Sequence, residues 1–316
     1  MSMKLDYKAS AFAIIAVLAL GACEPEEDVA PTPTPTTDMS AAPEIAPSPT
    51  PVTAEAAMQA ALAGDWRVAP ERDAFRHPAE TLAFFGVEPD MTVVEIWPGG
   101  GWYSSVLGPY LKQGGGTLVA AGPDPAASDY AANSVQKFTE TFIAHPETYG
   151  DINMSIAAKT SESLAPPESA DVVLTFRNIH NWMKGEYADK MFKDAYAALK
   201  PGGILGVVEH RLPSAEEQDP QANSGYVQEA YVIKLAEEAG FEFVESSEIN
   251  ANPADTADHP FGVWTLPPVS RSAPREGEAP EGFDPSVYAA IGESDRMTLK
   301  FVKPLPAETV ETDTTQ

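Results

Sequence analysis

The sequence predicts an α/β fold in which helices cover both faces of a mostly parallel sheet. Between residues 92 and 240, short apolar runs of strand length alternate with amphipathic runs of helix length. These apolar runs do not alternate with polar residues, as strands do when one face of their sheet meets water, so both faces should be covered. The last two apolar runs, 241–249 and 296–302, have no predicted helix between them, which predicts a terminal antiparallel hairpin.

The individual elements follow from local signals. The run "AEAAMQAALA" (54–63) is helix-forming, and Pro78 and Gly86 mark the first residue and the end of a second helix. Further helices are expected at 102–113, at 128–144 with Ser128 as a cap, at 187–200 and at 225–240. Strands are expected at 92–97, 116–122, 171–176, 204–210, 241–249 and 296–302.

Residues 1–22 have the pattern of a secretory signal peptide, with two lysines before the apolar run "AFAIIAVLAL". The run ends in "LGAC", which resembles the lipobox of bacterial lipoproteins. That resemblance implies cleavage before Cys23 and acylation of Cys23, which would anchor the protein to a membrane. An ordinary secretory signal with an incidental cysteine is the alternative. Cys23 is the only cysteine, so the chain has no intramolecular disulfide and no cysteine-based metal site.

The composition divides the rest of the chain into three parts. Residues 23–53 are rich in proline and poor in large apolar side chains, which predicts a disordered tether. Residues 54–303 are expected to form the folded domain, and 304–316 a disordered acidic tail. The net charge of −27 excludes nucleic-acid binding by phosphate neutralisation. We therefore expect an exported, membrane-anchored lipoprotein that faces the periplasm. Glu24, rather than aspartate, after the cysteine favours the outer membrane.

Several phrases of the sequence resemble a known family. The order of strand, glycine loop and helix, followed by "LKPGGILGVVEH" and a closing strand pair, is similar to class I S-adenosylmethionine-dependent methyltransferases. "RHPAETLAFFGVEPDMTVVEIWPGGGWY", "FRNIHNW" and "NPADTADHPFGVWTLPP" resemble a bacterial group of exported predicted methyltransferases. The resemblance covers most of residues 70–303. It implies a Rossmann-like, doubly wound, mostly parallel seven-stranded sheet with a terminal antiparallel hairpin, and S-adenosyl-L-methionine as the cofactor.

The resemblance assigns the cofactor loop to residues 95–101. Glu95 takes the place of the acidic residue that ends the first strand, and Trp97 stands where the family has its first glycine. Gly99 and Gly101 match the second and third glycines, and Gly100 lies between them. Glycines there allow close approach of the backbone to a ligand, and the following helix N-terminus offers N–H groups to a carboxylate. The alternative is a tight turn that packs the helix on the sheet.

The adenosine end of the cofactor is less completely matched. Asp124, in "AAGPDP" after the second strand, is the candidate for the ribose hydroxyls, and turn formation explains it equally well. After the third strand the family usually has an acid near the adenine amine; here the segment offers Ser161, with its neighbours Thr160 and Glu162, without a clean match.

The acceptor site is expected at the carboxyl ends of the later strands. In "FRNIHNW", Arg177 and Asn178 are candidates to orient an acceptor, and His180 to take its proton near neutral pH. Packing of His180 in the core is the alternative. Glu209 and His210 emerge on the same rim. Glu209 and His210 suggest acid–base assistance to the acceptor. With His180 they could instead form a divalent transition-metal site. A simple ion pair of Glu209 with Arg211 is the third alternative. No metal motif is present, and no metal is predicted.

The segment 248–268 is long, polar and rich in proline. Long ordered loops in compact domains are uncommon and often functional. It is therefore expected to cover the site, with Asn250 and His259 as substrate contacts and Trp264 as an apolar wall. A surface excursion packed by its own side chains is the alternative.

The leading interpretation is a methyltransferase that acts on a small-molecule acceptor outside the cytoplasm. A non-catalytic, membrane-tethered ligand-binding or envelope protein that reuses the fold is the second, because Trp97 occupies the first glycine position. A hydrolase that uses Glu209, His210 and His180 is a third. The sequence shows no serine or cysteine nucleophile elbow for it.

Overall fold

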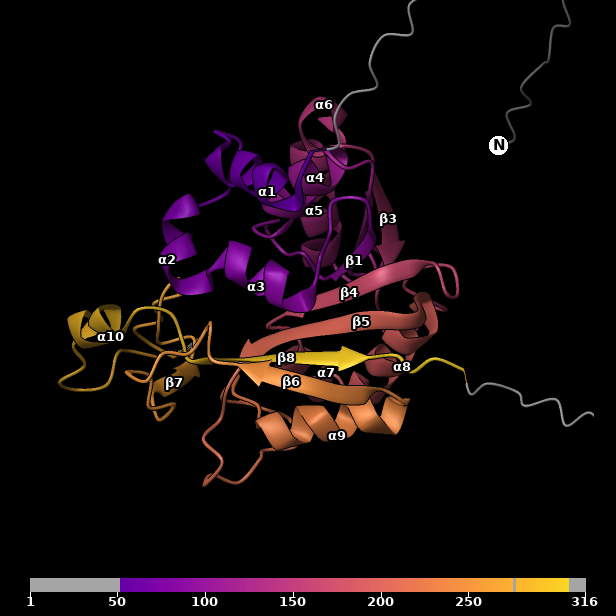
Figure 1. The fold of residues 1–316 in the computed structure, drawn as a ribbon. Coiled ribbons are helices and arrows are strands. Elements are labelled where there is room, and N and C mark those ends of the chain that lie inside the picture. The colour runs from indigo at the N-terminus through magenta and orange to yellow at the C-terminus, as the bar shows by residue number, and fades with distance from the viewer. Residues whose placement is uncertain (1–51, 275–276, 307–316) are drawn as a thin grey trace, which may run out of the picture. The chain divides into compact units, whose positions relative to one another are not determined.

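The structure is a computed structural model that describes residues 52–274 and 277–306 (Figure 1). The predicted signal peptide (1–22), Cys23, nearly all of the tether and residues 307–316 of the tail lie outside the described residues. Among the described residues, no helix is long and apolar enough to cross a membrane.

Seven strands of the described residues form one sheet, in the order β3-β2-β1-β4-β5-β8-β6 (Figure 1). The first five in this order are parallel, and β8 is antiparallel to both β5 and β6. The fold is therefore the predicted doubly wound, mostly parallel sheet with an antiparallel hairpin. The strands are β1 (Thr92–Ile96), β2 (Thr117–Gly122), β3 (Ile152–Ile156), β4 (Ala170–Phe176), β5 (Leu199–His210), β6 (Glu242–Ser247) and β8 (Arg296–Val302).

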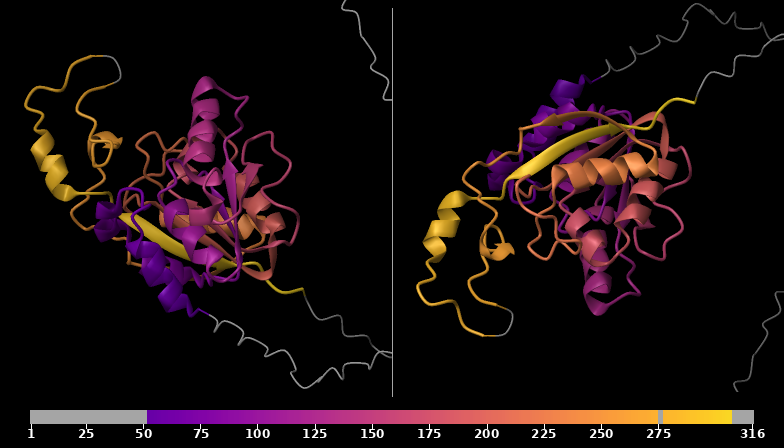
Figure 2. Two further views of the ribbon diagram at one scale, coloured as in Figure 1. Left: turned by 90° about the horizontal axis from the view of Figure 1, so that it is seen from above. Right: turned by 90° about the horizontal axis from the view of Figure 1, so that it is seen from below.

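Helices cover both faces of the sheet, and each face has its own apolar core (Figures 1 and 2). One core contains Phe85, Leu107 and Tyr110 from the helices before and after β1. The other contains Trp182 and Phe192 from the helices after β4. The helices are α1 (Ala54–Ala63), α2 (Asp73–Arg76), α3 (Pro78–Phe85), α4 (Ser104–Lys112), α5 (Asp129–Phe138), α6 (Pro146–Tyr149), α7 (Ile179–Lys184), α8 (Ala188–Ala198), α9 (Glu229–Ala239) and α10 (Pro285–Ile291), with short turns η1 (Pro70–Arg72) and η2 (Thr139–Ile143).

The helix ends that the sequence marks are where the structure has them. The Ser128 hydroxyl accepts a hydrogen bond from the Ala131 amide at 3.2 Å and so caps α5. Gly86 ends α3 at φ +73°, a left-handed conformation that favours glycine.

Some predicted boundaries are wrong. The helix expected at 225–240 begins only at Glu229, because the Val227 amide instead donates to the His210 carbonyl at the end of β5. The helix expected at 128–144 changes to a π-helical turn at Thr139. The segment between β6 and β8 contains a short strand, β7 (Pro260–Val263), and α10, although no helix was expected there.

The strand order reverses between β1 and β4, which are neighbours although β2 and β3 separate them in the sequence. In open α/β sheets, ligands bind outside the carboxyl ends of the strands at such a switch point. Figure 1 shows α2, β7 and α10 on the side of the sheet toward which the carboxyl end of β5 points.

Candidate functional site

Among the cavities at the carboxyl edge of the sheet, two share walls at the switch point between β1 and β4. The first, the β1–β3 cavity, has a volume of about 640 Å³ and lies among the segments that follow β1, β2 and β3. The second, the β4–β5 cavity, has a volume of about 350 Å³ and lies among the ends of β1, β4 and β5 and the segment 263–269. Trp97, Gly99 and Asn178 line both. Both volumes are in the range of small-molecule sites.

The glycine loop keeps its shape although it begins with a tryptophan. Trp97 has φ +50°, a left-handed conformation that a glycine adopts at lower cost. Its indole Nε1 donates to the Ala157 carbonyl at 2.7 Å, which fixes the ring across the end of β3. Gly99 (φ +59°) and Gly100 stay exposed beside it.

The three loop glycines have different surroundings. A Cβ added at Gly99 or Gly100 would have no described atom within 4 Å, whereas at Gly101 it would lie 2.1 Å from the Phe142 ring. Neither the Gly99 nor the Gly100 amide donates a hydrogen bond to another described residue. Residues 99 and 100 therefore form the open side of the loop, and Gly101 serves close packing.

Glu95 lies at the β4–β5 cavity, not at the β1–β3 cavity expected from its predicted cofactor role. Its carboxyl group is buried and accepts a hydrogen bond from the Ser104 hydroxyl at 2.6 Å. Burial raises the pKa of Glu95 to about 7, against the opposing effects of the Ser104 hydrogen bond and of Arg177. The group is therefore part acid and part carboxylate near neutral pH.

The two residues predicted for the adenosine end differ in position. Asp124 lines the β1–β3 cavity, and its Oδ1 also accepts from the Ala126 amide at 2.8 Å, as a turn-forming aspartate does. Ser161 is absent from the cavity lining. Its hydroxyl donates to the Ala158 carbonyl at 2.8 Å and accepts from the Ala158 amide. Its neighbours Lys159 and Thr160 line the cavity instead.

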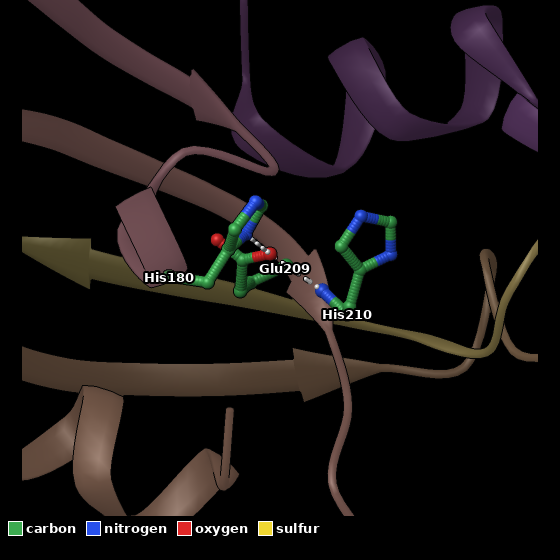
Figure 3. A group of neighbouring side chains, drawn as sticks. All are labelled: His180, Glu209 and His210. Atoms are coloured by element: carbon green, nitrogen blue, oxygen red, sulfur yellow. Dashed lines mark hydrogen bonds and ion pairs between the residues drawn. The ribbon is translucent and has the colours of Figure 1, made fainter. Parts of the chain in front are cut away.

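The predicted catalytic residues come together where β5 ends and α7 begins (Figure 3). His180 Nδ1 lies 3.1 Å from Glu209 Oε1, and the Glu209 carboxylate is fully buried. The Asn181 amide lies 3.0 Å from His180 Nε2. An amide nitrogen can only donate, so Nε2 is the acceptor and Nδ1 carries the proton that is donated to Glu209. Glu209 thereby fixes the ring orientation and tautomer of His180.

His210 lies beside this pair but is bound differently. Its ring centre is 5.5 Å from that of His180, and its Nδ1 lies 2.6 Å from the Ser294 hydroxyl. Burial, followed by the charges of His180 and Arg177, lowers the pKa of His210 well below its usual value. His210 is therefore neutral at neutral pH.

A metal could be held only after a change in these hydrogen bonds. One ligand atom each from His180, Glu209 and His210 lies within 4.8 Å of the others, and such a set suits a divalent transition metal. The Glu209 oxygens, however, already accept from His180, from the Ile179 amide at 2.6 Å and from the His210 amide at 2.8 Å. The carboxylate is thus arranged to position His180. Arg211, expected as its ion-pair partner, pairs instead with Asp295 and Glu248.

Arg177 and Asn178 follow β4 and reach the site as predicted. Arg177 has φ +62° and directs its guanidinium to the β4–β5 cavity, where Nη1 lies 3.8 Å from Glu293 Oε2. The Asn178 amide donates to the Ile96 carbonyl at 2.8 Å and so joins the ends of β1 and β4 at the switch point.

The segment 248–268 covers the site, but through residues other than those predicted for substrate contact. Asn250 is buried, and its amide donates to the Thr81 and Thr298 hydroxyls, both at 3.0 Å. His259 Nε2 lies 2.8 Å from Asp255 Oδ1. Neither residue lines the β4–β5 cavity, because these side chains hold the segment in place. The residues of this segment that do line the β4–β5 cavity include Val263, Leu266 and, as expected, Trp264. The Trp264 ring centre lies 6.0 Å from that of His180.

Sequence reasoning missed a group of charged residues in the β4–β5 cavity. Arg72 and Arg76 come from η1 and α2, and Glu293 comes from the segment before β8. The only sign of them in the sequence is the run of charged residues in "PERDAFRH" and in "GESDR". Both stretches lie outside the region in which predicted strands and helices alternate.

The chain is similar to solved structures that have this fold. An S-adenosylmethionine-dependent methyltransferase from Aquifex aeolicus is 18% identical, with 57% of this chain and 88% of that chain covered and a TM-score of 0.42. One from Mesorhizobium loti is 13% identical, with 71% and 96% covered and a TM-score of 0.44. The cyclase SpnF is 14% identical, with 77% and 86% covered and a TM-score of 0.45. No protein-family model and no curated protein matches the sequence. The similarities lie below 20% identity, so function is inferred from the residues of the site.

Proposed function

We propose that the protein is an S-adenosylmethionine-dependent methyltransferase with a small-molecule acceptor. The observation that carries this proposal is the shared wall of the two cavities at Trp97, Gly99 and Asn178. A methyl donor in one cavity and an acceptor in the other would meet at this wall, beside the His180–Glu209 pair. Holding two reactants in contact is the main source of catalysis in such a transfer.

The residues of the β1–β3 cavity fit the cofactor. Gly99 presents to an anionic group an amide that donates to no described residue, and the Trp97 indole is fixed in the wall by its hydrogen bond to Ala157. Asp124 offers a carboxylate to ribose hydroxyls, and the alanines and Tyr130 in the lining offer apolar surface. When bound, S-adenosylmethionine supplies a methyl group activated by a sulfonium.

The chain's own residues then have distinct roles. His180 accepts the acceptor's proton at Nε2, once the acceptor's donor group has replaced the Asn181 amide that donates to this nitrogen in the structure. Glu209 is a positioning residue that stabilises the imidazolium so formed. The segment 263–269, with Trp264, forms part of the wall of the β4–β5 cavity.

A ligand-binding protein without methyl transfer is the second candidate. The observation that favours it is Trp97 itself, which keeps a bulky indole in the wall of both cavities at a position with glycine backbone geometry.

We further propose that acylated Cys23 tethers the protein to a membrane facing the periplasm. The support is the "LGAC" sequence and the proline-rich stretch that follows it. The Cys23→Ser variant should pass from the membrane fraction to the soluble fraction. Equal membrane association of both proteins would contradict the anchor.

The proposed function is tested by calorimetric titration of the purified full-length protein with S-adenosylmethionine and S-adenosylhomocysteine. We expect micromolar binding that weakens about tenfold in Asp124→Asn, because a charged hydrogen-bond acceptor is replaced by a neutral one. The turn at Asp124 also accepts asparagine, so the fold should persist. Asp151→Asn, at an exposed residue outside both cavities, is the matched control.

The possible results separate the two candidates. Binding that weakens in Asp124→Asn and is kept in Asp151→Asn supports the methyltransferase. No heat and no thermal shift at millimolar cofactor would overturn it and leave the ligand-binding protein.

A further inference from the structure

Four arginines surround one buried glutamate at the wall of the β4–β5 cavity. Glu293 Oε1 lies 2.6 Å from Arg72 Nε, and Oε2 lies 3.1 Å from Arg76 Nε and 3.0 Å from Arg296 Nη1. Arg177 Nη1 lies 3.8 Å from the same Oε2. We call these four residues the arginine cluster. Arg72, Arg76 and Arg177 line the cavity itself.

The arginine cluster carries more positive charge than the described carboxylates around it neutralise. Four guanidinium groups share the single carboxylate of Glu293, and the nearby Glu95 is held partly protonated by burial. Burial, followed by the charge of Arg177, lowers the pKa of Arg76, against the opposing effect of Glu293. Buried charges are normally paired, because an unpaired one carries a large desolvation penalty.

Two guanidinium nitrogens of this cluster also lack hydrogen-bond partners. Arg76 Nη1 and Arg72 Nη2 are buried and donate to no described residue. The Arg76 side chain is only 2% exposed, and its guanidinium stacks 4.7 Å from the centre of the Trp102 ring. Unsatisfied buried donors are uncommon in folded proteins, and an oxyanion in the adjoining cavity would give these two an acceptor.

The backbone of Arg177 is held in an unfavourable conformation that places its side chain at the cavity. A φ of +62° is costly for a residue with a side chain, and such strain clusters at ligand sites. The Arg177 amide donates to the Val208 carbonyl at 2.7 Å, which secures this geometry between β4 and β5.

The rest of the cavity wall is apolar and aromatic. Tyr103 and Phe176 stack with ring centres 3.6 Å apart, and Trp264 and Leu266 also line the cavity. Ser294, adjacent to Glu293 in the sequence, bonds to His210, so the charged wall and the histidines adjoin. A ligand of this cavity would therefore meet guanidinium groups, aromatic rings and His180.

We propose that the β4–β5 cavity binds a small organic acid with an aromatic or apolar body, whose oxyanion head group contacts Arg72, Arg76 and Arg177. The head group is a carboxylate or a phosphate monoester, since both match guanidinium donors in charge and geometry. The proposal that the cavity binds an anion does not depend on the proposed function. The role of the anion as the methyl acceptor rests on the proposed function.

The probes are 4-hydroxybenzoate, phenyl phosphate and the neutral 4-hydroxybenzamide, each titrated into the purified full-length protein without cofactor. We expect the two anions to bind at least about tenfold more tightly than the amide, with affinity falling as salt rises. The tighter of the two anions identifies the head group.

Arg177→Gly is the decisive variant. It removes one guanidinium and places glycine at a positive φ, so the fold should be retained. We expect it to weaken binding of the preferred anion by about tenfold to a hundredfold. Arg72→Gln should weaken it similarly. Lys234→Gln, at a lysine 71% exposed on α9, is the control that removes a positive charge elsewhere.

The proposal is overturned if the amide binds as tightly as both anions, or if Arg177→Gly and Arg72→Gln both bind the anions like the unaltered protein. These results do not depend on the cofactor titration described above. The cofactor titration can therefore contradict the methyltransferase assignment while anion binding is confirmed. Equally, the anion titration can contradict anion binding while cofactor binding is confirmed.

Discussion

The glycine loop permits a sharp test, because its three consecutive glycines have three different reasons to be glycine. Alanine at each position adds the same single carbon. Gly100 has neither a positive φ nor a close neighbour, Gly99 has a positive φ alone, and Gly101 has a positive φ and a Cβ position 2.1 Å from the Phe142 ring.

The expected losses in the free energy of unfolding follow from these environments. Gly100→Ala should change it by no more than about 0.5 kcal/mol. Gly99→Ala should lose about 1–2 kcal/mol from the left-handed backbone alone. Gly101→Ala adds overpacking of about 1–3 kcal/mol, for a total of about 2–5 kcal/mol. Phe142 cannot yield easily, since it is 1% exposed and packs between Phe138 and Tyr149.

Urea denaturation of the three variants under one set of conditions measures the order. The reasoning also predicts that Phe142→Ala relieves the clash, with a coupling of at least about 1 kcal/mol in a double-mutant cycle with Gly101→Ala. Equal losses at positions 99 and 101, or no coupling to Phe142, would refute the assignment of Gly101 to close packing.

Three buried carboxylates yield further predictions. Burial raises the pKa of Glu95 from 4.5 to about 7, so its stabilisation is complete below about pH 4.5 and is lost as the pH rises through about 7. Glu95→Gln should remove that slope, and thermal melts with parallel pH profiles for both proteins would contradict it. Glu209→Gln should lose about 3 kcal/mol in urea denaturation, because an amide cannot accept from Ile179, His180 and His210 together. A loss below about 1 kcal/mol would count against this. Glu293→Gln should lose about 3–5 kcal/mol by leaving the arginines without a counter-charge, and an unchanged melting temperature would exclude that role.

The sequence predicted the central part of the sheet well and its margins less well. β1, β4 and the last part of β5 are buried on both faces, so each appears in the sequence as an unbroken apolar run. The edge strand β3 is largely exposed and carries polar residues, and it lacks that signal. The one-and-a-half-turn helix α7 is too short for helical periodicity to reveal.

The part of the site that lies at the carboxyl ends of the strands was predictable from the sequence. His180 follows β4, and Glu209 and His210 are the last residues of β5; these strands pair in parallel, and the carboxyl ends of such strands meet at one edge. Arg72 and Glu293 were not predictable in this way, because their segments lie outside the strand and helix alternation. Asn250 and His259 were wrongly predicted to contact substrate. A long covering segment also needs polar side chains that form hydrogen bonds within the protein, and these two residues have that role.

The arginine cluster lies inside a chain whose net charge is −27, and this contrast governs how an anion would reach it. Outside the cavity the acidic surface repels an approaching anion, whereas inside the cavity the guanidinium groups attract it. Salt screens the long-range repulsion more than the contacts made in the buried cavity. Raising the ionic strength should therefore accelerate entry of the organic acid while it weakens the final complex, so that the residence time shortens more steeply than the equilibrium affinity falls.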